Sequence, residues 1–96
     1  MKHGGSSYII TNKHNTTFYA GSAEDLIARI IEHKEKLFPN SFSARYNLNK
    51  LVFYRNFSRI EEAREHERYI KGKSRNWKID LINSFNPDWI DLYDQI

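Results

Sequence analysis

The sequence contains no cysteine and only two prolines in its 96 residues. The absence of cysteine excludes a disulfide scaffold, a Cys-ligated zinc site and thiol catalysis, and it makes a reducing cytoplasm the expected compartment. Apolar runs are short, as in Tyr8-Ile9-Ile10, and fall far below the roughly 20 residues that a transmembrane helix needs. Residues 1–7 lack the apolar stretch of a signal peptide, and we expect them to be flexible.

The chain does have the apolar and aromatic content of a folded domain. Hydrophobic residues make up 40%, aromatic residues 15% and charged residues 28% of the sequence. A disordered chain would be poor in aromatic residues. The length fits one domain, so we expect residues 1–96 to fold as a single unit, with the tail from residue 86 packed on its core.

Positive charge is concentrated in the middle of the chain. Residues 45–78 carry ten Lys and Arg against four Glu, whereas residues 79–96 carry four Asp and no Lys or Arg. A basic segment with interleaved Tyr, Phe and Trp is typical of proteins that bind nucleic acid. The same pattern is also found on the solvated surface of a helix, and charge alone does not decide between the two.

The spacing of apolar residues predicts two strands, over residues 8–12 and 17–20, joined by a connection at 13–16. Gly21 is expected to let the backbone turn sharply, and Ser22 to cap a helix that runs to about Leu37. Residues 40–49 are polar and are expected to be irregular, before a third strand from Leu51 to about Phe57.

Two further helices follow the third strand. Ser58 and Glu61 have the spacing of a capping box, and Gly72 is expected to end that helix in a left-handed conformation. Another helix is expected from about Trp77 to Phe85, before Pro87. The order β-β-α-β-α-α predicts an α+β fold, in which a small three-stranded antiparallel or mixed sheet is flanked by helices.

Two pairs of residues are candidates for catalysis. Tyr8 and Tyr19 lie on the first two strands, where a tight hairpin would place them side by side. The alternative is that they are two core aromatic residues on paired strands, without a catalytic role. Arg29 and His33 are four residues apart, so both project from one helix face and could bind a phosphate. The alternative is a helix flank in which local glutamates pair with them.

Glu67 falls on the inward face of the second helix, between Ala63 and Ile70. A buried carboxylate is unfavourable without a partner, so it is a candidate ligand for Mg²⁺ or Mn²⁺. The alternative is a partly buried ion pair with Arg29 or Lys71. The sequence has no P-loop, no dinucleotide-binding or esterase motif, and no histidine spacing suited to a metal cluster.

Taken in order along the chain, these residues resemble the GIY-YIG nuclease superfamily, and in particular its small stand-alone bacterial branch. The resemblance runs from about Tyr8 to Trp89. No single motif is specific, but the ordered set is. It consists of Tyr8-Ile9-Ile10-Thr11-Asn12, Phe18-Tyr19-Ala20-Gly21, Asp25-Leu26 with Arg29 and His33, Arg45-Tyr46-Asn47, Leu51-Val52-Phe53-Tyr54, Glu67 with Lys71, Gly72 and Arg75, and Asn86-Pro87 with Trp89.

Four positions depart from the pattern of that branch. Ser6 and Ser7 replace an aromatic or glycine and an apolar residue, and Ala20 replaces isoleucine. His66 replaces an arginine that often precedes the glutamate. The changes at Ser7 and Ala20 remove packing volume from two central strands, and we expect them to weaken the fold locally.

The resemblance implies a metal-dependent endonuclease that hydrolyses phosphodiester bonds, with DNA as the expected partner. It implies Glu67 as the ligand of one Mg²⁺ or Mn²⁺ ion, Arg29 as the group that stabilises the phosphate, and Tyr8 as the general base. Because a phenol has a pKa near 10, nearby cations must lower it or Tyr8 must act within a proton relay. Tyr19 and His33 would position Tyr8 and the attacking water.

Five basic residues are expected to contact the nucleic-acid backbone: Arg45, Lys71, Lys73, Arg75 and Lys78. We expect weak sequence preference, with a nick, flap or branch as a preferred structure. Two alternatives stay open: a non-catalytic module that binds nucleic acid on the same scaffold, and a protein-interaction domain that docks through Trp77, Trp89 and Tyr93.

Overall fold

A three-stranded antiparallel sheet in the order β2-β1-β3 forms the centre of the computed structural model, which describes residues 4–96. The predicted α+β fold and its order of elements are confirmed. Two short elements are additional, namely α2 within the segment expected to be irregular and the 3-10 helix η1 in the tail. The elements are β1 (Gly5–Thr11), β2 (Phe18–Ala23), α1 (Leu26–Glu35), α2 (Phe42–Arg45), β3 (Lys50–Phe57), α3 (Ile60–Lys71), α4 (Arg75–Phe85) and η1 (Leu92–Gln95).

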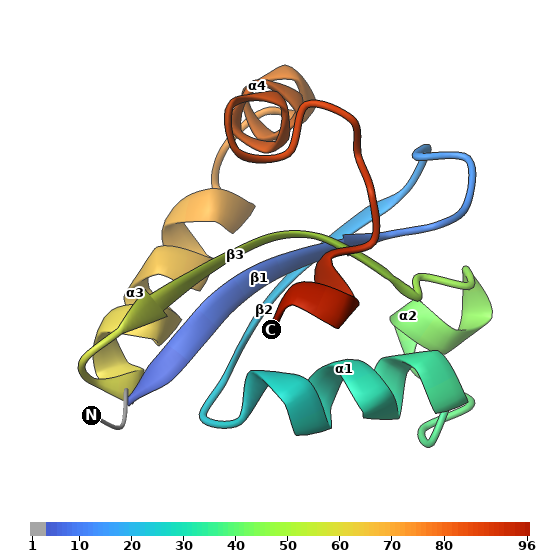
Figure 1. Ribbon diagram of the computed structural model, residues 1–96, viewed down its shortest axis with the longest axis horizontal. Coiled ribbons are helices and arrows are strands. Elements are labelled where there is room, and N and C mark those ends of the chain that lie inside the picture. The colour runs from blue at the N-terminus through green and yellow to red at the C-terminus, as the bar shows by residue number, and fades with distance from the viewer. Residues whose placement is uncertain (1–3) are drawn as a thin grey trace.

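Helices cover both faces of the sheet (Figure 1). On one face α1 and η1 enclose a core that includes Tyr8, Ile30 and Leu92. On the other face α3 and α4 enclose a core that includes Ile9 and Ile70. Since successive residues of a strand point to opposite faces, β1 contributes Tyr8 to one core and Ile9 to the other.

The N-terminal segment is ordered where the structure describes it. Gly5, Ser6 and Ser7 are buried residues of β1, so the expectation that residues 1–7 are flexible is wrong for 5–7, and residues 1–3 lie outside the described range. The two serines are accommodated in the sheet by hydrogen bonds: the Ser6 hydroxyl lies 2.6 Å from Asn56 Oδ1, and the Ser7 hydroxyl 2.7 Å from His66 Nδ1.

Three of the predicted helix boundaries are corrected by the structure. Asp25 rather than Ser22 caps α1, by accepting a hydrogen bond from Ala28 N at 3.1 Å. Helix α3 begins after Arg59 rather than Ser58, and Glu62 accepts the Arg59 N–H at 3.1 Å. Gly72 ends α3 with a φ of −78°, so it is not left-handed, whereas Lys36 ends α1 with a φ of 53°.

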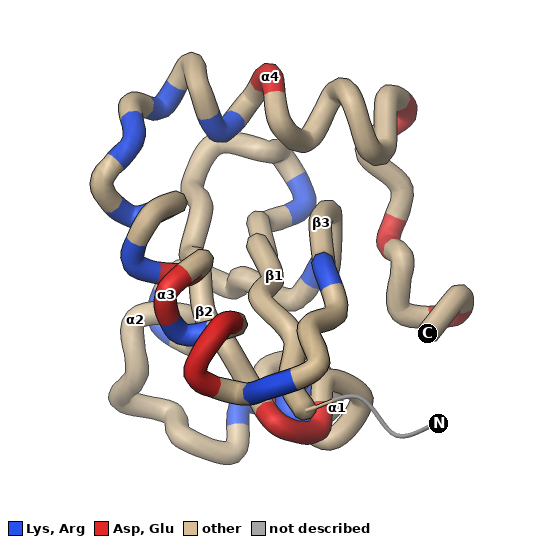
Figure 2. Tube along the Cα trace, turned by 90° about the vertical axis from the view of Figure 1, so that its left-hand side faces the viewer, with Lys and Arg blue, Asp and Glu red and all other residues tan. Residues whose placement is uncertain are grey.

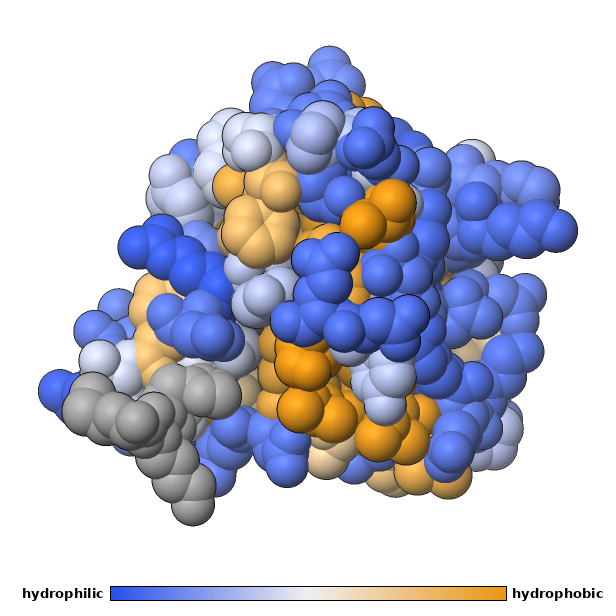
Figure 3. Space-filling model, viewed as in Figure 1, coloured by the Kyte–Doolittle hydropathy of each residue, from blue (hydrophilic) through white to orange (hydrophobic). Residues whose placement is uncertain are grey.

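The tail from Asn86 lies along the sheet. Asn86 is buried, and its amide donates to Val52 O at 3.2 Å and to Ile90 O at 2.8 Å. Asp91 pairs with Lys34 of α1 and accepts the Leu51 N–H at 3.2 Å. Figure 3 shows apolar residues gathered where η1 lies beside α1, which is where the tail covers the core.

The aromatic residues weighed above as a docking surface pack within the domain. Trp77 meets the ring of Tyr69 edge-on at 5.6 Å, and Trp89 lies 5.7 Å from Phe18. Tyr93 packs against the core under α1. Every helix within the described residues 4–96 is too short or too polar to span a membrane.

Candidate active site

Tyr8 lies buried on the α1 face of β1, directly opposite Gly21 of β2. The partner of Tyr19 is Ile10, so Tyr8 and Tyr19 share a face of the sheet but lie diagonally rather than side by side as expected. A Cβ atom at Gly21 would come within 2.4 Å of the Tyr8 hydroxyl oxygen. Gly21 therefore makes room for the phenol within an extended strand, and the sharp turn expected at this glycine is wrong.

A chain of hydrogen bonds runs from Tyr8 through His33 to Ser43. The Tyr8 hydroxyl lies 2.9 Å from His33 Nε2, and His33 Nδ1 lies 2.9 Å from the Ser43 hydroxyl. Burial and the neighbouring Tyr19 raise the pKa of the Tyr8 phenol, and Arg29 opposes this only in part. Burial and the charge of Arg29 lower the pKa of His33. Tyr8 is therefore protonated and His33 neutral, which leaves one imidazole nitrogen able to accept a proton.

Arg29 and Tyr19 flank this chain. The Arg29 guanidinium donates to Ser22 O at 3.4 Å and pairs with Glu32 at 3.2 Å, at the rim of the site. The Tyr19 ring lies 6.0 Å from the ring of His33. A planar guanidinium in this position can bind two oxygens of a phosphate.

Glu67 projects from α3, on the opposite side of the sheet from Tyr8. Its carboxylate accepts a hydrogen bond from the Ser22 hydroxyl at 2.5 Å and pairs with Lys71 at 2.7 Å. Burial alone would raise the pKa of Glu67, but the hydrogen bonds from Lys71 and Ser22 outweigh it and lower that pKa. The carboxylate is thus ionised at neutral pH, with 21% of its side chain exposed.

The site encircles the outer edge of β2. Because β2 pairs only with β1, groups from the two faces of the sheet can meet around it. Ser22 links them, since its carbonyl accepts from Arg29 and its hydroxyl donates to Glu67. Lys71 reaches over the same edge, and its Nζ atom lies 5.2 Å from the centre of the Tyr19 ring. The structure therefore brings together all five residues predicted from the sequence as catalytic.

The chemistry at Glu67 fits a hydrated divalent cation. Mg²⁺ is commonly held by one or two carboxylates, with water and substrate phosphates as its other ligands. Glu67 is an ionised, partly exposed carboxylate, and it already attracts the ammonium group of Lys71. Among residues 4–96 no cluster of three or more His, Asp or Glu could form a fuller cage. A metal here would depend on Glu67, water and the substrate.

The basic residues predicted to bind nucleic acid continue from this edge. Figure 2 shows Lys and Arg residues following one another from the end of α3 into α4. Lys71 and Lys78 line a hollow of about 320 Å³ together with Tyr19 and Phe42. Lys73 lies 4.4 Å from the ring of Tyr69, and Arg75 lies 4.5 Å from the ring of Phe18. Arg45 is separate from this stretch and lies exposed on α2.

Two hydrogen-bonding partners of the candidate residues, Ser22 and Ser43, are not predicted from the sequence. Ser22 was assigned to a helix cap, and Ser43 lies in the segment expected to be irregular. Strand alternation gives a signal for Ser22, because Ala20 and Ser22 must face α3 when Tyr19 and Gly21 face α1. For Ser43 the sequence holds no such signal, because its contact with His33 depends on how α2 returns to α1.

In a comparison with protein-family models, residues 5–80 match the GIY-YIG catalytic domain. The match covers most of the 96 residues, so the chain belongs to the GIY-YIG catalytic-domain family. This is a family of nucleases that act on nucleic acid and typically use divalent metals. The resemblance inferred from the motifs is thereby confirmed. Comparison with curated proteins and with solved structures gave no significant match.

Proposed function

We propose that this protein is a metal-dependent endonuclease that hydrolyses phosphodiester bonds of DNA. The observation that carries the proposal is a pair of contact sets at β2. Tyr8 is hydrogen-bonded to His33, and Ser22 is hydrogen-bonded to both Arg29 and Glu67. These groups supply a proton acceptor, a phosphate ligand and a metal ligand, which are the parts that hydrolysis requires.

In this proposal Glu67 and water hold one Mg²⁺ or Mn²⁺ ion. When bound, the ion supplies Lewis-acid stabilisation of negative charge on the phosphodiester. The Ser22 hydroxyl donates to Oε1 of Glu67 and holds the carboxylate in place, while Lys71 pairs with Oε2 and would compete with the ion for this carboxylate. With its carboxylate partner engaged by the ion, Lys71 would be available to bind a phosphate of the substrate.

Tyr8 and His33 remove the proton from the attacking water. The raised pKa of Tyr8 argues against a free phenolate as the base and favours a relay. In the relay, Tyr8 Oη takes the proton of the water as it passes its own proton to His33 Nε2. The resulting imidazolium donates from Nδ1 to the Ser43 hydroxyl, which lies 2.9 Å away. Arg29 stabilises the charge that builds on the phosphate oxygens.

The test is cleavage of labelled DNA by the wild type and by Glu67→Gln, with Mg²⁺, Mn²⁺ or EDTA. The panel contains single strands, blunt duplexes, nicks, flaps and branches. We expect metal-dependent cleavage that Glu67→Gln reduces by at least about 10²-fold. The matched control is Glu65→Gln, since Glu65 is an exposed glutamate of the same helix. Full activity of Glu67→Gln would refute the mechanism, and binding without any cleavage would favour a non-catalytic module.

Lys73 and Arg75 are proposed to bind the phosphate backbone. A Lys73→Ala/Arg75→Ala variant should bind DNA of every sequence more weakly, with a slope of affinity against salt that is smaller by about two. Lys13→Ala serves as the control, because Lys13 is exposed in the hairpin connection between β1 and β2. An unchanged salt slope would show that these residues are only solvated surface.

A further inference from the structure

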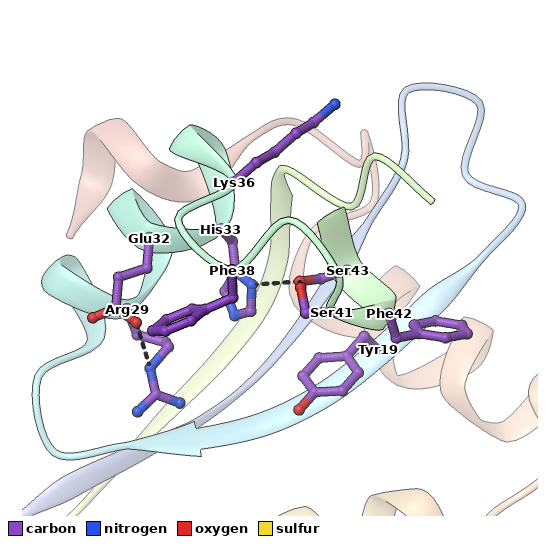
Figure 4. A pocket seen from close by; sticks show the side chains of 9 residues that line it. All are labelled: Tyr19, Arg29, Glu32, His33, Lys36, Phe38, Ser41, Phe42 and Ser43. Carbon is purple, nitrogen blue, oxygen red and sulfur yellow. Dashed lines mark hydrogen bonds and ion pairs between the residues drawn. The ribbon is translucent and has the colours of Figure 1, made fainter. Parts of the chain in front are cut away.

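A pocket of about 500 Å³ opens beside the candidate active site, between α1 and the segment that leads into α2 (Figure 4). We call it the α1–α2 pocket. Its volume lies within the range of about 300–1,000 Å³ that is usual for sites of small organic ligands. It is lined by Tyr19, Arg29, Glu32, His33, Lys36, Phe38, Ser41, Phe42 and Ser43.

Aromatic rings stand on two sides of the α1–α2 pocket. Figure 4 shows Phe38 on one side and Tyr19 with Phe42 on the other. Phe38 is 65% exposed and Phe42 47% exposed, although both are large apolar side chains. Phe42 is supported from behind by Tyr46, whose ring centre lies 4.7 Å away, and it also packs on Tyr19 at 6.4 Å. Such supported and exposed rings form a platform for stacking a flat ligand.

Polar groups connect this platform to the phosphate site. Arg29 and His33 line the pocket, and the same two residues contact the groups around Tyr8 and Ser22. Ser41 and Ser43 add hydroxyl groups, and Lys36 and Glu32 add charged ones at the rim. A phosphate bound by Arg29 would therefore have its own nucleotide, or the next one, within reach of the aromatic rings.

We propose that the α1–α2 pocket binds one unstacked nucleobase next to the scissile phosphate. A base within a duplex is stacked on both sides and paired at its edge, so it cannot enter a pocket lined by rings. An unpaired base can leave its strand and stack on an aromatic side chain. The inference rests on the proposed nuclease function and adds a substrate class to it. That class is nucleic acid with an unpaired nucleotide at the cleavage position, as in single strands and flaps.

The first test measures binding in EDTA, where no cleavage takes place. We compare a single-stranded DNA oligonucleotide with the blunt duplex of the same sequence, for wild type and Phe42→Ala. We expect Phe42→Ala to lose about fivefold to a hundredfold in affinity for the single strand, since one base–aromatic stack is lost. Affinity for the duplex should not change in Phe38→Ala, because Phe38 does not line the hollow that holds Lys71 and Lys78. Phe38→Ala should act in the same direction, and Phe42→Trp should restore binding.

Leu37→Ala is the matched control, because Leu37 is an apolar residue of the same loop that is 55% exposed and does not line the pocket. A second readout places the fluorescent base 2-aminopurine at successive positions of the single strand. Stacking should quench it at one position with the wild type and not with Phe42→Ala. Thermal unfolding of each variant confirms that the fold is retained.

The two proposals fail separately. If Phe42→Ala and Phe38→Ala bind single strands as the wild type does, or lose duplex affinity equally, the base pocket is refuted while Glu67-dependent cleavage can still be found. If no metal-dependent cleavage exists, the nuclease proposal fails. The binding difference in EDTA would then still support a base-binding pocket.

Discussion

The contact between Ser7 and His66 gives the sharpest prediction about stability. Both residues depart from the motif pattern that the resemblance implies, and the structure pairs them: Ser7 is fully buried, and its hydroxyl lies 2.7 Å from His66 Nδ1. The imidazole also packs between Phe53 and Phe57, at 6.2 and 5.3 Å. We expect the two departures to compensate each other, so that the local weakening expected from the lost volume at Ser7 is offset in part by this hydrogen bond.

The magnitudes follow from burial. His66→Phe keeps an aromatic ring but leaves the Ser7 hydroxyl buried without this partner, which should destabilise the fold by about 1–3 kcal/mol. Ser7→Ala leaves a half-exposed imidazole that water can reach, so its effect should be about 0.5–1.5 kcal/mol. The double variant removes both partners and should be less destabilised than the sum, by roughly 1 kcal/mol. In a domain of this size, 1 kcal/mol lowers Tm by about 4–8 °C.

The assay is urea unfolding of the wild type, the two single variants and the double variant. Unfolding is monitored by circular dichroism at about pH 8, where His66 is neutral. His14→Phe is the control, because His14 is exposed in the hairpin connection. If the two single effects add within about 0.3–0.5 kcal/mol, the residues are not coupled and the reasoning is refuted.

Two further predictions concern the glycines and the histidines. Gly21→Ala should lower the rate of DNA cleavage by about 10²-fold, because the added Cβ displaces Tyr8. Gly72→Ala is the control and should cleave like the wild type, since its added Cβ meets nothing nearer than 3.6 Å. Equal rates for the two variants would show that the Tyr8 phenol can shift freely. Burial lowers the pKa of both His33 and His66, so below pH 6.5 the unfolded chain binds more protons than the folded one. The free energy of unfolding should therefore fall as pH drops from 6.5 toward their folded pKa values. A His33→Gln/His66→Gln variant should flatten that slope, and an unchanged slope would assign it to other groups.

Much of the fold could be predicted from the sequence because local signals agreed with tertiary packing. The alternation of Tyr8, Ile9 and Ile10 and the helical spacing of Leu26 and Ile30 each placed an element correctly. Boundaries failed where several residues could serve as caps, as at Ser58 and Arg59. Which of these two residues caps α3 depends on the path of the chain as it leaves β3, and neighbouring residues in the sequence do not determine that path.

The residues of the candidate site could be predicted from the sequence, but their positions relative to one another could not. Their positions along the chain give no information on strand register, so the diagonal placement of Tyr8 and Tyr19 and the space left by Gly21 had to come from the structure. Glu67 was weighed as a metal ligand or as a partner of Lys71. The structure gives the ion pair, and the proposal requires that the metal compete with it. Partners such as Ser22 and Ser43 depend on long-range packing.

The position of β2 at the sheet edge explains how this small domain can build such a site. Tyr8 itself belongs to the central strand β1, and its hydroxyl reaches β2 beside Gly21. At the edge, Ser22 contacts Arg29 through its carbonyl and Glu67 through its hydroxyl, so one residue fixes the groups from both faces. It follows that Ser22→Ala should lower the affinity for the metal while leaving phosphate binding by Arg29 unchanged. The backbone contact to Arg29 would persist, while Glu67 would lose the hydroxyl that holds it.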